Sequence, residues 1–242
     1  MAIWPFKSKK SDKPAAPAKR STGFSAADYS RLTATLASES EHIMQIIRGQ
    51  GKTLRARSRQ IANSTSYGSK FLQMCVSNIC GPVPFRFQAK NKFSSGKYDK
   101  ASNAKLEVEW RKWGKPGQCD FESRLSLADM QRLLVRTLAC DGEVLIRKRQ
   151  GKNAGPWGLQ LQIIDTDRLD EDKNEELPNG NTIICGVEID PDGKTVAYHL
   201  MKRKPKDWLY RSVRDHIRVT ADQIIHLFLP LYPEQVRGVP WM

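Results

Sequence analysis

Residues 126–149 read SLADMQRLLVRTLACDGEVLIRKR and predict a helix, a turn and a strand in direct succession. Ser126 is a typical N-cap, and the helix that it begins is expected to run to about Cys140. Four apolar residues recur at helical spacing and are expected to face inward: Met130, Leu133, Leu134 and Leu138. Asp141-Gly142 supplies a turn, and Glu143 to Arg149 reads as a strand.

Short strands dominate the sequence after this unit. Five are expected, at Leu159 to Ile164, Ile183 to Ile189, Thr195 to Met201, His216 to Val219 and Ile224 to Phe228. The turn residues Asp190-Pro191-Asp192-Gly193 favour a hairpin between the second and the third of these strands. An acidic loop from Asp165 to Glu176 and a charged loop from Lys202 to Arg214 separate the others.

The sequence before residue 120 is mainly helical in pattern. A helix is expected near Ser25, a break at Gly49-Gln50-Gly51, and a basic helix from about Thr53 to Asn63. An apolar helix follows, whose buried stripe would consist of Phe71, Leu72, Cys75, Val76 and Ile79, and which Gly81 and Pro82 would end. Val83 to Phe87 reads as a strand. A helix near Ala104 to Trp113 would use Leu106, Trp110 and Trp113 as core anchors.

These patterns predict an α+β fold, with N-terminal helices packed on a mixed, mainly antiparallel sheet body. Residues 1–22 are rich in Lys, Ser, Pro and Ala, and we expect them to form a disordered basic tail. We expect residues 23–118 to form a helical segment and residues 119–242 to form the sheet body. The apolar end, Arg237 to Met242, reads as cut off, so this body is expected to be truncated there.

Positive charge is the main feature of the composition. The 242 residues include 40 basic and 26 acidic side chains, for a net charge of +14. Such an excess favours a polyanionic neighbour, usually nucleic acid. No apolar run approaches the roughly 20 residues that span a bilayer, so we expect no membrane association. The five cysteines lack the close pairing of zinc ligands and are expected to be reduced and mostly buried.

Motifs with catalytic potential are weak. Gly51-Lys52-Thr53 lacks the earlier glycine of a phosphate-binding loop, since Ile46 stands at that position. Asp190 and Asp192 lack the further ligands of a calcium loop. His226 lies in an apolar run, where a hydrogen-bonded core histidine is the ordinary case. We therefore expect no catalytic residue, no cofactor and no metal ion.

Two alternatives stay open at this point: a metal-dependent nuclease, and a simple basic nucleic-acid-binding protein. The acids Asp165, Asp167, Asp170, Glu171 and Asp172 could bind a divalent ion as nuclease carboxylates do, although a run of acids in a loop is usually solvated. Arg55 and Arg59 are four residues apart and share a helix face with Lys52 nearby. This face is either solvated or in contact with a phosphate or a partner.

Several segments, in order from about residue 50 onward, resemble the lambda family of phage portal proteins. They are Leu54 to Arg59, Asn78 to Gly81, Trp110 to Trp113, Gln131 to Glu143, Leu159 to Leu169, Gly186 to Glu188 with Val196 to His199, and Ile225 to Phe228 with Arg237 to Trp241. The resemblance implies a structural subunit of the head-tail connector ring, usually a dodecamer, through which double-stranded DNA is packaged and ejected. This chain would be the N-terminal portion and would form the outer wing, without the stem, clip and crown.

The same resemblance implies the partners. They are other copies of the chain, the terminase large subunit, the head-completion and tail proteins, the capsid and scaffold proteins, and the passing DNA. The protein would be found in the virion, and in the host cytoplasm during assembly. In a ring, one face of each subunit complements a different face of the next. Oppositely charged loops could supply that contact, with Asp167, Asp170 and Asp172 facing Lys204 and Lys206.

Overall fold

Four helices lie in the part of the chain that the computed structural model describes, which is residues 42–83, 85–202 and 215–242. They are α1 (Ile43–Ser64), α2 (Ser66–Ile79), α3 (Lys100–Trp113) and α4 (Leu127–Asp141). The start of α4 is as predicted, because the Ser126 hydroxyl accepts from the backbone N–H of Asp129 and the Asp129 side chain accepts in return. The helix ends at Gly142, whose left-handed backbone (φ 85°) suits a glycine.

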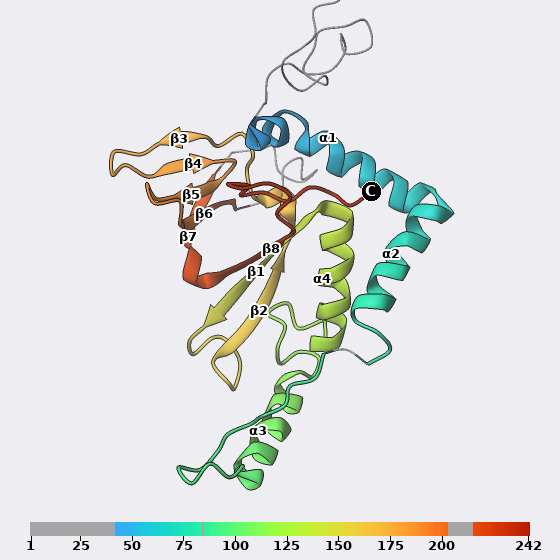
Figure 1. Cartoon of the computed structure of the whole chain (residues 1–242), viewed down its shortest axis with the longest axis vertical. Helices are drawn as coiled ribbons and strands as arrows, with labels where there is room; N and C mark the ends of the chain where they lie inside the picture. Colours follow the sequence, from blue (N-terminus) through green and yellow to red (C-terminus); the bar gives the residue numbers. More distant parts are fainter. Residues whose placement is uncertain (1–41, 84, 203–214) are drawn as a thin grey trace, which may run out of the picture. The chain divides into compact units, whose positions relative to one another are not determined.

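Two antiparallel sheets make up the body (Figure 1). The first has the strand order β2-β1-β8, where the strands are β1 (Glu143–Gln150), β2 (Leu159–Ile164) and β8 (Ile224–Phe228). The second has the order β3-β4-β5-β6-β7, where the strands are β3 (Glu175–Glu176), β4 (Thr182–Ile184), β5 (Val187–Ile189), β6 (Thr195–Met201) and β7 (His216–Thr220). Together with the helices, these sheets confirm the predicted α+β class.

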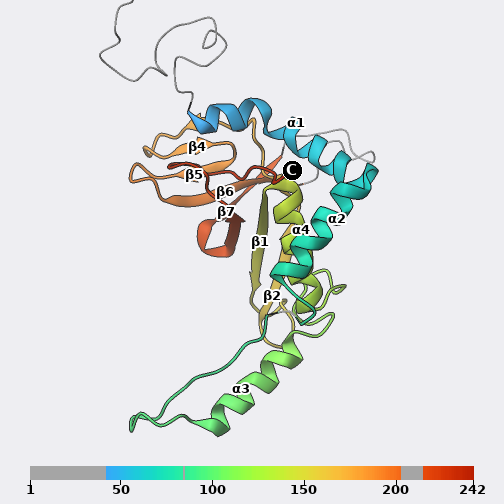
Figure 2. The ribbon, with the colours of Figure 1, turned by 45° about the vertical axis from the view of Figure 1, so that its right-hand side comes forward.

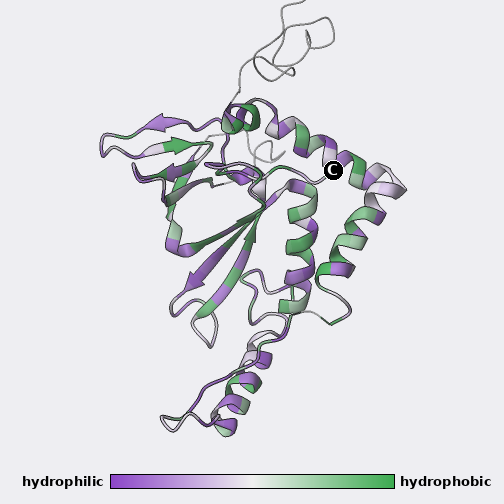
Figure 3. Cartoon of the chain, in the orientation of Figure 1, coloured by the Kyte–Doolittle hydropathy of each residue, from purple (hydrophilic) through white to green (hydrophobic). Residues whose placement is uncertain are grey.

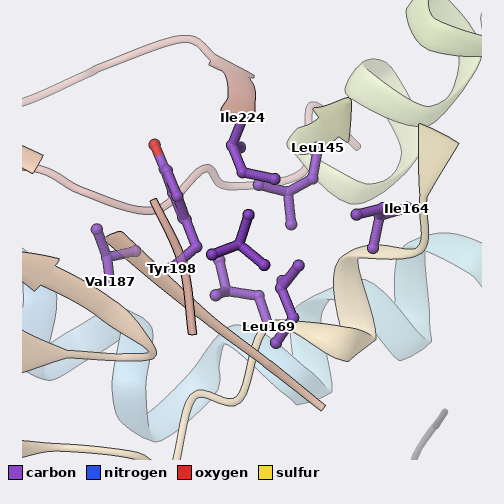
Figure 4. Close-up of a cluster of buried hydrophobic side chains, with 8 residues drawn as sticks. Leu145, Ile164, Leu169, Val187, Tyr198 and Ile224 are labelled. Carbon is purple, nitrogen blue, oxygen red and sulfur yellow. The ribbon is translucent and has the colours of Figure 1, made fainter. Parts of the chain in front are cut away.

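The main core lies between the two sheets (Figure 4). Leu145 and Ile164, which are register partners in β1 and β2, contribute to it from the first sheet. Val187 and Tyr198, which are partners in β5 and β6, contribute from the second. Leu169 follows the short 3-10 helix η2 (Thr166–Arg168) and is 1% exposed. Burying these side chains from both sheets holds the sheets together, at about 25 cal/mol for each Å² of apolar surface removed from water.

Helix α4 covers the other face of the first sheet. Met130 on α4 packs in a cluster with Leu159, Leu161 and Ile163, which belong to β2. On its other side α4 meets α2, where Leu72 and Ala139 are buried in one cluster (Figure 2). Because the apolar residues of α4 face both the sheet and α2, the helix is the centre of this layer.

The N-terminal half of α1 packs elsewhere. Met44 and Ile47 are buried with Cys185, in the β4–β5 turn, and with Val236 and Val239 near the end of the chain. Residues 42–242 form one compact unit, and the predicted boundary between residues 118 and 119 falls inside it. Whether the two segments fold separately stays a prediction. The predicted tail, residues 1–22, and the predicted helix near Ser25 lie outside the described residues.

The predicted break at Gly49-Gln50-Gly51 is wrong, because α1 continues through it. A Cβ atom at Gly51 would lie 3.2 Å from Oε1 of Glu171, whereas one at Gly49 would meet nothing within 4 Å. The glycine at position 51 therefore lets a carboxylate approach the helix closely.

Three smaller predictions also need correction. Val83, Phe85, Arg86 and Phe87 form no strand, and both phenylalanines are exposed. The predicted strand Ile183 to Ile189 is two strands with a turn at Cys185 and Gly186, both of which have positive φ. Trp113 is buried as expected, but Leu106, Trp110 and Leu133 are 45%, 39% and 38% exposed.

Candidate functional site: buried charge networks

A buried ion pair joins the start of β1 to the end of the chain. Glu143 and Arg237 are both 0% exposed. The Nε atom of Arg237 donates to both Glu143 oxygens, at 2.9 and 3.0 Å, and its Nη1 donates to the carbonyl oxygen of Cys185 at 2.7 Å. His226 Nε2 lies 3.0 Å from Oε2 of Glu143, so this histidine is a hydrogen-bonded core histidine, as predicted.

The electrostatics of this pair favour the charged forms. Burial by itself would raise the pKa of Glu143, but the Arg237 charge and the His226 contact outweigh burial and hold that pKa well below its ordinary value. Burial acts to lower the pKa of Arg237, and the Glu143 charge raises it above the ordinary value. A buried charge is tolerated only when it is paired and hydrogen-bonded, so each residue requires the other.

Close backbone contact accompanies the pair. A Cβ atom added at Gly142 would lie 2.1 Å from the Val239 carbonyl carbon, and one added at Gly238 would lie 2.1 Å from the Gly142 oxygen. The Gly238 N–H donates to Glu143 at 2.8 Å, and the Trp241 N–H donates to the Ala139 oxygen at 3.1 Å. The segments Asp141-Gly142-Glu143 and Arg237 to Trp241, which are far apart in sequence, are thus one structural unit.

A second network joins α1 to the acidic loop. Arg55 Nη2 lies 2.5 Å from Oε1 of Glu171, and both side chains are buried. Arg59 is bound by Asp141 at 2.7 Å and by Asp167 at 2.5 Å, and these carboxylates raise its pKa above the ordinary value despite partial burial. Arg237 Nη2 lies 3.4 Å from Glu171, so the two networks meet at that carboxylate.

Most of the predicted site residues take part in these networks or lie beside them. Lys52 pairs with Asp172 at 2.7 Å, on side chains that are 56% and 44% exposed. Asp170 is 4% exposed and lies 2.9 Å from Nε2 of His216. The basic helix and the acidic loop, which were predicted as separate features, therefore contact each other within the chain. Their role in a subunit contact stays a prediction, and Lys204 and Lys206 lie outside the described residues.

A further buried carboxylate lies in the second sheet. Glu188 is 1% exposed, and Arg218 donates to it at 2.7 and 3.0 Å. Hydrogen bonds from Arg218 and Asn181, together with the His199 contact, outweigh burial and lower the pKa of Glu188 to about 2. Burial lowers the pKa of His199 below its ordinary value. Glu188 thus remains ionised although it is buried in strand β5.

The sequence reading missed Glu143, Glu188 and Arg237 as members of networks. A signal was present, because each stands beside apolar residues that the patterns place in the interior, as in Glu143-Val144-Leu145. A charged residue in such a position calls for a partner of opposite charge, but the sequence does not identify that partner.

The arrangement is rich in paired charges. Among residues 42–83, 85–202 and 215–242, no group of three or more His, Cys, Asp or Glu side chains is placed to hold a metal ion. The Asp190 side chain accepts from the backbone N–H of Lys194, as its place in the predicted hairpin requires. None of the described helices has both the length and the apolar character of a bilayer-spanning segment.

Comparison with known proteins relates the chain to a protein family and to a curated protein. The profile of the family described as "Phage portal protein, lambda family" matches residues 29–242. A protein named "Probable portal protein", from Halomonas phage phiHAP-1, is 35% identical over 207 residues, which are 85% of this chain and 39% of that protein. The chain therefore spans about two fifths of the length of this relative.

Proposed function

This chain belongs to the lambda family of phage portal proteins, and from that premise we propose that it is a structural subunit of the portal ring through which double-stranded DNA enters and leaves the phage head. The observation that carries the proposal is the family match, which extends over residues 29–242. The family is structural, and we propose that this chain has no catalytic activity of its own.

The networks support a structural role. Asp141, Glu143, Asp167 and Glu171 each contact an arginine within the chain, so their charges hold α1, the acidic loop and the C-terminal segment against the sheets. A nuclease would need such carboxylates to be available to a divalent ion. The nuclease alternative is therefore not favoured.

The partners follow from this role. We propose that copies of the chain contact one another in a ring, usually of twelve, at one vertex of a procapsid made of capsid and scaffold proteins. Terminase would dock on the ring during packaging, and head-completion and tail proteins would replace it. The protein would be part of the virion, and the ring would assemble in the host cytoplasm.

Disruption of the gene in a phage that carries it tests the proposal. An amber mutation in the codon of Trp113 should leave heads without packaged DNA, and a suppressor strain that inserts tryptophan should restore DNA-filled heads. Normal packaging without suppression would contradict the proposal.

A nuclease assay tests the alternative. The purified protein, incubated with DNA and either magnesium or manganese, should leave the DNA intact. Cleavage that the Asp167→Ala substitution abolishes would establish the alternative and overturn the proposed function.

A further inference from the structure

Positive charge gathers at the far end of β1, outside the networks described above. Arg147, Lys148 and Arg149 follow one another there, and this end of β1 is hydrophilic in Figure 3. Successive side chains of a strand point to opposite faces, so Arg147 and Arg149 share one face. Arg168, from η2, carries a further charge close enough to lower the pKa of Arg147.

The arginines of β1 differ from those of the networks in their partners. In the part of the chain that the structure describes, no ion pair links Arg147 or Arg149 to a carboxylate. Arg149 donates through Nε and Nη2 to the neutral side-chain oxygen of Gln162, at 3.0 and 2.8 Å. The Nε atom of Arg147 is buried and has no hydrogen-bond partner among the residues that the structure describes. A buried donor that lacks a partner is unfavourable, so an acceptor at this position would be stabilising.

The mutual repulsion of these positive charges also favours the binding of an anion. Burial lowers the pKa of Arg147, and the charges of Arg149 and Arg168 lower it further. Burial and the Arg149 charge also lower the pKa of Arg168, although Asp165 and Glu122 act in the opposite direction. An anion bound among these guanidinium groups would relieve the repulsion.

The end of β1 also has room for a ligand. Strand β8 pairs with β1 only as far as Arg147, opposite Ile224, whereas β2 pairs with it to Gln150, opposite Leu159. The last three residues of β1 therefore have a neighbouring strand on one side only. A pocket of about 160 Å³ opens there, lined by Arg147, Lys148, Arg149, Gln150 and Gln223.

From this cluster, the unpartnered donor and the pocket, we propose that the end of β1 is a binding site for a phosphate group, held by Arg147 and Arg149. Guanidinium groups bind phosphate oxygens through paired N–H donors, with a geometry that lysine cannot supply. The ring of Phe121 lies 4.7 Å from the Arg149 guanidinium and helps to orient it. The phosphate belongs either to a nucleic-acid backbone or to a free anion, and the site does not depend on the proposed ring.

The test compares two double variants that lose the same charge. Arg147→Gln/Arg149→Gln removes the site, and Arg111→Gln/Arg132→Gln removes two arginines from α3 and α4. Calorimetry with inorganic phosphate measures free-anion binding. Fluorescence anisotropy with a 20-base-pair duplex, over a series of salt concentrations, measures backbone binding. Each phosphate contact contributes about 0.9 to the slope of log K against log salt concentration.

The expected results separate the two sources. If the source is a free anion, the site variant should bind phosphate at least tenfold more weakly than the control variant, with an unchanged DNA slope. If the source is the nucleic-acid backbone, the slope of the site variant should be smaller in magnitude than that of the control by about 0.9, the contribution of one phosphate contact. Equal phosphate affinity and equal slopes in the two variants would overturn the proposal. Thermal unfolding checks that both variants fold, and Arg149→Gln alone replaces the double variant if that one does not.

Discussion

At the residue scale, Arg237 is the cation on which the buried network depends. Arg237→Met would remove the main partner of the buried Glu143 carboxyl group. We expect a loss of about 3–5 kcal/mol in the free energy of unfolding, because that is the cost of removing one member of a buried pair. Urea denaturation of the chain measures it.

Lys112→Met is the matched control for this substitution. Lys112 pairs with Glu109 at 2.7 Å, but both side chains are about half exposed. Removing such a surface pair should cost less than about 1 kcal/mol. Equal losses of unfolding free energy in the two variants would show that the buried Glu143–Arg237 pair stabilises the fold no more than a surface pair does.

Glu188 predicts an acid dependence of stability. Its pKa is about 2 in the folded chain against an ordinary 4.5, so its contribution is complete above pH 4.5 and is lost as the pH falls toward 2. In that range the unfolded chain binds a proton that the folded chain does not. The contribution is on the order of 1–3 kcal/mol.

The variant Glu188→Gln isolates this contribution. Urea denaturation between pH 5 and pH 2 should show a smaller loss of stability in the variant than in the wild type, because the variant has no carboxylate to protonate at that position. Parallel curves for the two proteins would contradict the assignment.

At the element scale, the two glycines of α1 predict opposite effects. Gly49→Ala adds a methyl group where nothing lies within 4 Å, so it should stabilise the chain by about 0.5–1 kcal/mol through helix propensity. Gly51→Ala places that group 3.2 Å from the buried carboxylate of Glu171, and it should give no gain or a loss. Thermal unfolding compares them, and an equal gain in both would show that the contact with Glu171 does not constrain α1.

Elements that nearby residues determine could be predicted from the sequence, whereas elements that depend on distant contacts could not. Helix α4 has a local cap at Ser126, and strand β6 follows the turn at Asp190 to Gly193. The predicted positions of both elements, and those of β2 and β8, are confirmed. The continuous helix α1 could not be predicted, because a distant residue, Glu171, explains its second glycine. Likewise Phe85 and Phe87 alternate as a strand would, but they pair with no neighbouring strand.

The networks show the same limit for the site. Arg59 and Asp167 are both visible in the sequence as charged candidates, yet they lie 108 residues apart and contact each other only because of the fold. Charge pattern identifies which residues need partners, whereas topology decides which partners they find. The resemblance to the portal family could be stated from the sequence because it rests on ordered segments and needs no pairing of distant residues.

At the scale of the whole molecule, the predicted subunit contact is best tested at Asp172. Asp170 is buried and bonded to His216, so reversing its charge would disturb the subunit itself, whereas the Asp172 side chain is 44% exposed. Asp172→Lys should weaken ring assembly by the complete gene product, and Lys204→Glu/Lys206→Glu in the same chain should partly restore it. Sedimentation velocity at low and high salt measures assembly, since salt screens exposed charges.

Unchanged assembly by the Asp172→Lys variant would remove the acidic loop from the interface. A loss that the reversed lysines do not restore would leave Asp172 in the interface but exclude Lys204 and Lys206 as its partners. Because Lys52 pairs with Asp172 inside the subunit, Lys52→Glu serves as the control for loss of that internal contact.

The central claim is that this chain is a subunit of a portal ring, and electron microscopy of the complete gene product tests it most directly. Head-to-tail contacts whose rotation closes give a ring, whereas contacts that do not close give filaments. We predict annular particles with cyclic symmetry, about twelvefold, around a central channel. A monodisperse population of monomers or dimers, or open filaments without rings, would contradict the claim.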